Sequence, residues 1–90
     1  MAIYLVERYL PGIDDEGLRA IVRRLDGASA ELRAAGTDVR HLGSLYLPGE
    51  ESCFCQLEAP TAEAAAHVNE LALAPYARIS EAVALETEVT

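Results

Sequence analysis

The sequence contains no lysine: its seven basic residues are all arginines, and they are set against fifteen aspartates and glutamates. The resulting formal net charge of −8 at pH 7 lacks the basic footprint that nucleic-acid binding requires. The same charge disfavours attraction to an anionic membrane surface. An acidic surface suits cations, or it serves solubility alone. We therefore expect neither a nucleic acid nor a membrane among the partners.

Long hydrophobic runs are also missing, because no stretch is apolar for long enough to span a bilayer. The amino terminus lacks the basic start of a signal peptide, and Glu7 and Arg8 interrupt the apolar segment that such a peptide needs. We therefore expect a cytoplasmic protein whose two cysteines, Cys53 and Cys55, are thiols. A chain of this length predicts a single domain over residues 1–90.

Motifs typical of enzymes are absent as well. Neither Gly12 nor Gly49 belongs to a phosphate-binding glycine fingerprint, and no nucleophile elbow with partner acid and histidine occurs. A strand pair rich in basic and aromatic residues, as in RNA-binding sheets, is missing too. These absences favour a non-enzymatic protein without an organic cofactor.

Hydrophobic periodicity, capping residues and turn signals together predict six elements of secondary structure. In chain order they are a strand over residues 3–10, a helix from its cap at Asp14 to residue 35, strands over 38–47 and 52–59 joined by a Pro-Gly turn, a helix from Thr61 to the residue before Pro75, and a final strand within 79–89 that carries Val83, Leu85 and Val89 on one side.

The order strand, helix, strand, strand, helix, strand is that of the ferredoxin-like split βαβ fold. We therefore predict an α+β domain in which two helices cover one face of a four-stranded antiparallel sheet. The other face, with Phe54 and several aliphatic side chains, is left open. Because a large apolar face is rarely solvated, we expect a homodimer that packs these open faces together.

The strand over residues 52–59 has two chemically different faces, because successive side chains point to opposite sides. Cys53 and Cys55 share the apolar face, where we predict unreactive core thiols of raised pKa. The alternative is a soft-metal or redox pair, although a closed thiolate site needs further cysteine or histidine ligands.

His41 is predicted to lie on the open face, in register with Val39, Gly43 and Leu45. There it would join polar residues of neighbouring strands and form a cleft that binds a divalent ion or transfers protons. The alternative is a surface or interface histidine paired with a carboxylate. The residues of this candidate cleft are Glu7, His41, Phe54, Gln56 and Glu58.

His67 lies on the second predicted helix, with Glu63 four residues before it and Glu70 three after it. This spacing places the imidazole and both carboxylates on one helix face, where they form either a metal site or a solvated surface. The candidate metal ligands are therefore His67, His41, Glu63 and Glu70.

Short blocks of the sequence resemble a known family. Residues 4–12 (YLVERYLPG) resemble the opening strand of a group of small bacterial, chiefly actinobacterial, proteins whose best-known type is a nickel-binding, ferredoxin-like homodimer. Residues 55–60 (CQLEAP) are similar to the third strand of that group. Ser44 and His67 match a serine of its second strand and a histidine of its second helix.

The resemblance implies a dimeric protein that binds Ni(II), or another divalent transition metal, through histidine and carboxylate side chains. The sequence departs from the family pattern in residues 73–77, which lack a glycine before the proline, and it offers only two histidines. We therefore predict a non-enzymatic metal-binding protein, with His67 as the residue that the resemblance best supports. The alternative is a small cofactor-independent enzyme or ligand-binding protein that uses the open-face cleft.

Overall fold

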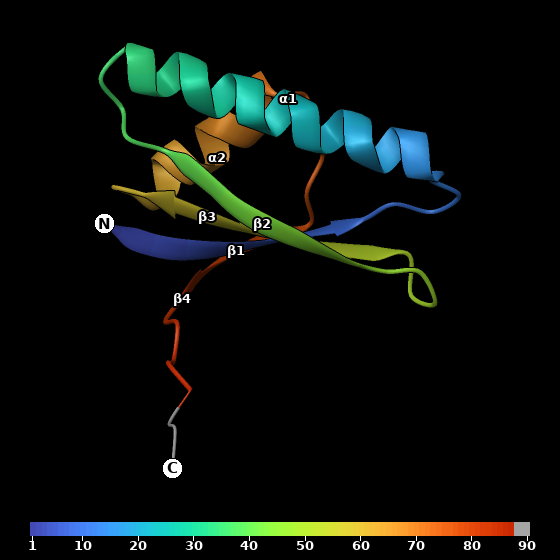
Figure 1. Cartoon of the computed structure of the whole chain (residues 1–90). Helices are drawn as coiled ribbons and strands as arrows, with labels where there is room; N and C mark the ends of the chain where they lie inside the picture. The colour runs from blue at the N-terminus through green and yellow to red at the C-terminus, as the bar shows by residue number, and fades with distance from the viewer. Residues whose placement is uncertain (88–90) are drawn as a thin grey trace.

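A computed structural model describes residues 1–87 and shows the predicted α+β arrangement. The elements follow the order β1 (Ala2–Tyr9), α1 (Asp15–Ala34), β2 (Arg40–Leu47), β3 (Ser52–Ala59), α2 (Ala62–Leu71) and β4 (Arg78–Ala82). The four strands form one antiparallel sheet in the order β2-β3-β1-β4. Both helices cover the same face of that sheet, and the other face is bare (Figure 1). The prediction of a ferredoxin-like fold is thus confirmed.

Both helices begin where the sequence predicts. The carboxylate of Asp14 accepts a hydrogen bond from the Gly17 backbone N–H at 2.7 Å, and the hydroxyl of Thr61 accepts one from Ala64 at 3.1 Å. Each side chain satisfies one of the backbone donors that the first helical turn leaves without a partner. The N-cap residues therefore fix where α1 and α2 start.

The hydrophobic core lies between the helices and the inner face of the sheet. Helix α1 buries one apolar stripe of residues, while the strands contribute alternate residues, as the pleat requires. In β3 the inward residues are the predicted ones, since Cys53, Cys55 and Leu57 are buried. The buried apolar residues of α1 are Ile21, Leu25, Ala28 and Leu32.

The last strand is shorter than predicted. β4 ends at Ala82, and the next residues leave the sheet on the side opposite the helices (Figure 1). Val83 and Leu85 are therefore exposed at 80% and 90%, not aligned on one side of a strand. The prediction for Val89 lies outside the described residues. The strand ends there because residues 83–87 have no neighbouring strand with which to form hydrogen bonds.

Candidate functional site

His41 does not lie on the open face of the sheet, so its predicted place in the cleft is wrong. In the register of β2 against β3 it stands opposite the buried Leu57, on the face that the helices cover. Its side chain is only 6% exposed. The open face keeps the other members of the predicted cleft, which are Glu7, Phe54, Gln56 and Glu58.

A β-bulge explains this reversal. The register shifts between His41 and Gly43, so Leu42 is an extra residue on β2 without a partner on β3. An inserted residue inverts the alternation of inward and outward side chains. Gly43 adopts a φ of 156°, a backbone conformation that residues with a side chain rarely adopt. A glycine within a strand is a known signal of a bulge, and this is the sequence feature that would have located His41 correctly.

The bulge brings four side chains from three elements into one hydrogen-bonded chain. The Asp26 carboxylate on α1 lies 2.8 Å from His41 Nδ1, and His41 Nε2 lies 2.8 Å from the Ser44 Oγ. The Ser44 hydroxyl in turn donates to the sulfur of Cys55 at 2.9 Å. We call this array the acid–thiol chain. It resembles the arrangement of an activated nucleophile, in which an acid orients a base, but here the Ser44 hydroxyl stands between the base His41 and the sulfur of Cys55.

Two further groups of the inner face lie beside the end of this chain. The sulfur of Cys53 is 3.9 Å from that of Cys55. Arg8 stands opposite Cys53 in the register of β1 against β3 and is 1% exposed. One of its nitrogens donates to the carbonyls of Ala74 and Pro75, while Nε and Nη2 have no partner within residues 1–87. A buried guanidinium that is not fully paired favours a negative charge nearby.

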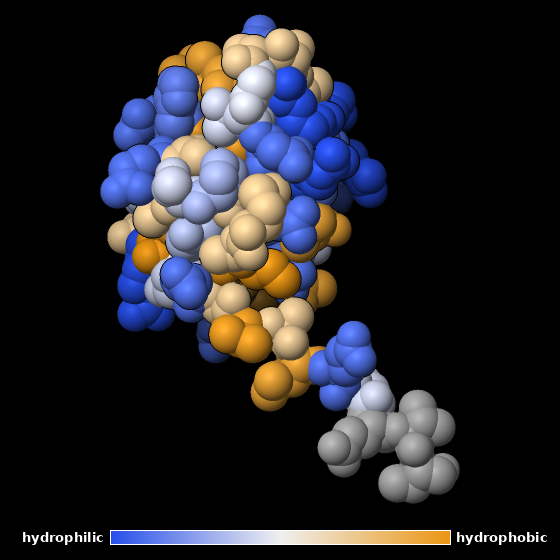
Figure 2. Space-filling view, turned by 90° about the vertical axis from the view of Figure 1, so that its left-hand side faces the viewer, coloured by the Kyte–Doolittle hydropathy of each residue, from blue (hydrophilic) through white to orange (hydrophobic). Residues whose placement is uncertain are grey.

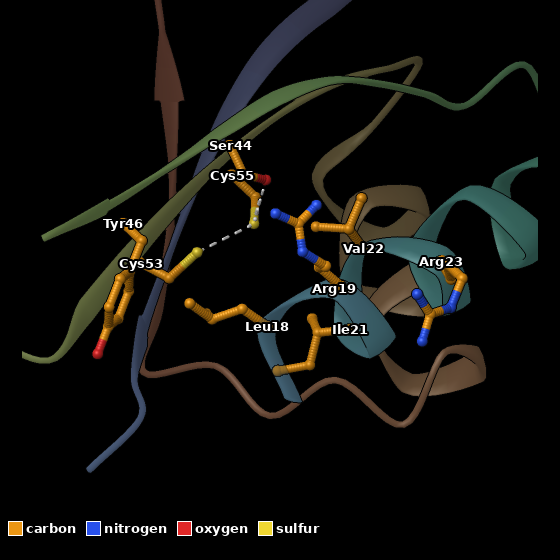
Figure 3. Close-up of a pocket in the computed structure, with 9 residues that line it drawn as sticks. All are labelled: Leu18, Arg19, Ile21, Val22, Arg23, Ser44, Tyr46, Cys53 and Cys55. Atoms are coloured by element: carbon orange, nitrogen blue, oxygen red, sulfur yellow. Dashed lines mark hydrogen bonds between the residues drawn. The ribbon is translucent and has the colours of Figure 1, made fainter. Parts of the chain in front are cut away.

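Both cysteines lie at the floor of a cavity of about 330 Å³ between α1 and the β2–β3 hairpin, where Cys53 is 4% exposed and Cys55 is fully buried. Figure 3 shows Cys53, Cys55 and Ser44 on the sheet side, facing residues of α1 across the cavity. The walls are mostly aliphatic, with one tyrosine and two arginines, each of which forms an ion pair with a carboxylate of α1. The lining residues on the walls are Leu18, Arg19, Ile21, Val22, Arg23 and Tyr46.

The two thiols differ in acidity. The pKa of Cys55 is lowered, first by the hydrogen bond from the Cys53 thiol and then by hydrogen bonds from its other polar neighbours and the charge of Arg8, which together outweigh burial. The same sulfur–sulfur hydrogen bond and burial raise the pKa of Cys53. The pKa of His41 is raised most by the Cys55 sulfur, which lies beyond the Ser44 hydroxyl, and less strongly by the hydrogen bond to Asp26, while burial opposes the rise. The prediction of raised pKa values is thus confirmed for Cys53 and wrong for Cys55.

The open-face residues do not form an acid–base cluster. Glu7 forms an ion pair with Arg78 on β4, not with its neighbour Arg8, because adjacent strand residues point to opposite faces. A shallow cavity of about 270 Å³ includes Phe54 and Gln56 but neither Glu7 nor Glu58. Without His41 this face lacks the base that the predicted enzyme needs.

The histidine of the second helix is placed as predicted. His67 is exposed on α2, as are Glu63 and Glu70. Within residues 1–87, no three histidine, cysteine, aspartate or glutamate side chains are arranged to hold a metal ion. Any metal on α2 would therefore have to draw these side chains together from their present positions.

Sequence reasoning also missed Asp26 and Arg8. Asp26 lies at the edge of the apolar stripe of α1, and only the bulge brings His41 within reach of it. Arg8 stands at an inward position of β1, between buried residues two positions to either side. A charged residue at an apolar position of an alternating strand was the available signal.

Comparisons with known proteins identify relatives of the chain. The sequence model of a family described as nickel responsive protein SCO4226-like matches residues 4–82. The crystal structure of SCO4226 from Streptomyces coelicolor A3(2) superposes with a TM-score of 0.79 at 22% identity, covering 96% of this chain and 100% of that one. That likeness shows a shared fold. No match is found among curated proteins. Within residues 1–87 no helix is long and apolar enough to cross a membrane.

Proposed function

The chain belongs to the SCO4226-like family of nickel-responsive proteins, and we propose that it binds Ni(II), or a similar divalent transition metal, without catalysing a reaction at that site. The ligands are the imidazole of His67 and the carboxylates of Glu63 and Glu70. The observation that supports this assignment is the exposure of all three side chains along one face of α2.

The donor set suits the ion. Imidazole binds Ni(II), Zn(II) and Cu(II) well, and carboxylates complete the sites of such ions in proteins. Residues four and three apart on a helix are neighbours on its surface, so rotation of exposed side chains can bring Glu63 and Glu70 toward the ring of His67. Fixing each side chain costs about 0.5–1.5 kcal/mol, and we expect a correspondingly weak site in a single chain.

His41 is a poorer ligand than His67 in this structure. Both of its ring nitrogens already form hydrogen bonds, to Asp26 and to Ser44, and the ring is nearly buried. Metal binding would break these bonds before it formed any new one. The proposed site therefore does not include His41.

Isothermal titration of the reduced protein with Ni(II) tests the assignment. We expect His67→Ala to remove the binding heat, and the double variant Glu63→Gln, Glu70→Gln, which loses both carboxylates, to weaken the affinity by at least about tenfold, or about 1.4 kcal/mol. His41→Gln, which changes the other histidine, is the matched control and should keep the wild-type isotherm. An unchanged isotherm in His67→Ala would exclude the helix site.

We further propose that the protein is a homodimer formed through the open face of the sheet. Large apolar side chains gather on that face, with Leu45 exposed at 69%, and continue onto residues 83–87. Figure 2 shows apolar surface extending from the body onto this projecting segment. Burial of one such patch by its symmetry copy forms a closed, self-complementary interface.

Size-exclusion chromatography with light scattering, which measures the molar mass of the protein in solution, tests the dimer. We expect a dimeric mass for the wild type and a monomeric mass for Leu45→Glu, because a charge buried in an apolar interface is strongly unfavourable. Leu71→Glu changes an equally apolar, exposed residue on α2 and should leave the dimer intact. A monomeric wild type at high concentration would exclude the proposed assembly.

A further inference from the structure

We propose that Cys55 is a nucleophilic cysteine that reduces an organic hydroperoxide bound in the cavity between α1 and the β2–β3 hairpin, with Cys53 as the second thiol. The acid–thiol chain, the sulfur–sulfur distance and the lining of the cavity carry this inference. The site lies on the inner face of the sheet and uses none of the three proposed metal ligands of α2.

The hydrogen bonds of the acid–thiol chain define where the protons lie. The Ser44 hydroxyl has one proton and donates it to the Cys55 sulfur, so its oxygen accepts from His41 Nε2 at 2.8 Å. The carboxylate of Asp26 only accepts, so His41 Nδ1 also carries a proton. A ring with both nitrogens protonated is an imidazolium. Either thiol can donate the sulfur–sulfur hydrogen bond, and with Cys53 as its donor Cys55 accepts both of its hydrogen bonds, as a thiolate does. The chain thus holds a nucleophile and a proton donor, joined by one hydroxyl.

Arg8 provides a second, independent reason for a negative charge at this position. Its guanidinium is 1% exposed, and it forms no ion pair with a carboxylate in the described residues. A buried cation without a counter-charge is costly. Its cross-strand neighbour is Cys53, and its charge lowers the pKa of both thiols. A Cys55 thiolate supplies the missing counter-charge.

The cavity indicates the class of substrate. Its volume is about 330 Å³, roughly ten times the volume of one molecule in liquid water. The cavity can therefore hold a molecule much larger than hydrogen peroxide. Leu18, Ile21 and Val22 offer an aliphatic wall opposite the thiols (Figure 3). These features fit a hydroperoxide with an apolar organic group, whose peroxide end reaches Cys55 when the side chains that cover this buried residue move aside.

The reaction balances with the groups present. The Cys55 thiolate attacks the terminal oxygen of the hydroperoxide, so a sulfur–oxygen bond forms as the oxygen–oxygen bond breaks. The electron pair leaves on the alkoxide, which takes the His41 proton through the Ser44 hydroxyl and departs as an alcohol. The Cys53 thiol then attacks the sulfenic acid, and its own proton leaves with the hydroxyl as water. Two thiols become a disulfide, and an external dithiol, the reductant of this cycle, restores them.

Cys53 is within reach for the second step. Two residues along a strand have Cα atoms about 6.5 Å apart, near the upper limit of the roughly 4.4–6.8 Å that disulfides span, and their Cβ atoms must approach to about 3.5–4.5 Å, so the bond requires local bending of β3. The two sulfurs already point the same way, at 3.9 Å. This second thiol favours a peroxide over an acyl substrate, because acyl transfer would leave Cys53 without a role.

Trapping of the sulfenic acid tests the proposal. Reduced protein, freed of metal with a chelator, is treated with cumene hydroperoxide in the presence of dimedone, and the adduct is located by peptide mass spectrometry. We expect the adduct at Cys55 in the wild type, none in Cys55→Ser, and a persistent adduct without disulfide in Cys53→Ser. Because metal is absent, this result is independent of nickel binding at His67.

The roles of the other residues are separated by rate and pH profile. Removal of the proton donor should slow oxidation by about a hundredfold, the lower range for general acid catalysis. We expect this for Ser44→Ala, while Ser80→Ala on the open face leaves the rate unchanged. His41 supplies the proton through Ser44, and Asp26 is a positioning residue that orients the ring. His41→Gln should therefore slow oxidation as Ser44→Ala does, and both His41→Gln and Asp26→Asn should shift the pH at which the rate rises toward that of an ordinary thiol, a change that a merely structural role would not cause.

Several outcomes would overturn the proposal. One is oxidation of both thiols at the rate of free cysteine, with the same pH profile in wild type and His41→Gln. Another is adduct formation only in denaturant, since this would mean that the cavity does not admit the hydroperoxide. A third is tight Ni(II) or Zn(II) binding that protects the thiols and is lost in Cys53→Ser, which would assign the pair to a metal.

Discussion

Ser44 stands directly opposite Cys55 in the register of β2 against β3, and its hydroxyl donates to the cysteine sulfur at 2.9 Å. The bulge at Leu42 brings His41 onto the same face as this pair. If the hairpin register continued without a bulge, Ser44 would still face Cys55, but Leu42 would stand opposite Leu57 and His41 would face the open side. One inserted residue therefore decides whether the acid–thiol chain forms at all.

The bulge should depend on Gly43. At its φ of 156° a side chain is strained, and such strain costs about 1–3 kcal/mol. We expect Gly43→Ala to lower the free energy of unfolding by that amount, measured by urea denaturation. Gly49→Ala, in the turn between β2 and β3, has open space and no positive φ and should change stability little. Equal effects of the two changes would contradict the role assigned to Gly43.

Arg8 should influence the thiols through its charge. Arg8→Met keeps much of the buried stem volume and removes the guanidinium, so we expect the pKa of Cys55 to rise and the thiolate fraction at neutral pH to fall. Ultraviolet absorbance of the thiolate across a pH titration measures this directly. Arg23→Met, at the exposed wall of the cavity, is the control and should shift the titration much less. A titration unaffected by Arg8→Met would remove the electrostatic argument for the thiolate.

Stability should depend on pH through His41. Its pKa is raised in the folded state, so its protonation stabilises the fold below the ordinary imidazole pKa of about 6.5, and this contribution is lost as the pH rises through the folded value. Asp26→Asn removes one cause of the rise. We therefore expect the unfolding free energy of the variant to fall less steeply with pH above neutrality.

The lowered pKa of Cys55 acts in the opposite sense. The contribution of the Cys55 thiolate to the free energy of unfolding is present above the ordinary thiol pKa and is lost as the pH falls through the folded value.

Glu31→Gln, on the side of α1 that faces α2, is the control for Asp26→Asn, because it removes a negative charge from α1 away from His41. Parallel pH curves for wild type and Asp26→Asn would contradict the coupling. The titratable and charged groups that face His41 and Cys55 are Arg8, Arg19, Arg23, Asp26, Tyr46 and Cys53.

Gly27 should limit the stability of α1. It lies in the helix interior on an exposed face, and a Cβ there meets nothing within 4 Å. Gly27→Ala should therefore raise the free energy of unfolding by about 1 kcal/mol, the difference in helix propensity. Ala30→Gly on the same helix should lower it by a similar amount. Thermal denaturation monitored by circular dichroism compares both, and a destabilised Gly27→Ala would mean that this position needs glycine.

Most of the fold could be predicted because its signals are local. Asp14 and Thr61 cap the helices where the sequence places them, and alternation along residues 52–59 assigns the buried face of β3 correctly. The end of β4 could not be predicted, since Val83 and Leu85 have strand-like character but no neighbouring strand. Pairing is a property of two segments, and one segment does not encode it alone.

The sequence by itself determined the topology, the inward direction of both cysteines and the exposed imidazole and carboxylates of α2, because each follows from a period of two or of 3.6 residues. Only the tertiary structure decided that His41 meets Asp26, Ser44 and Cys55, and that Arg8 stands beside the thiols. The physical reason is that register and helix placement join residues distant in the chain. A single bulge at Leu42, whose trace in the sequence is Gly43, changed which of them meet.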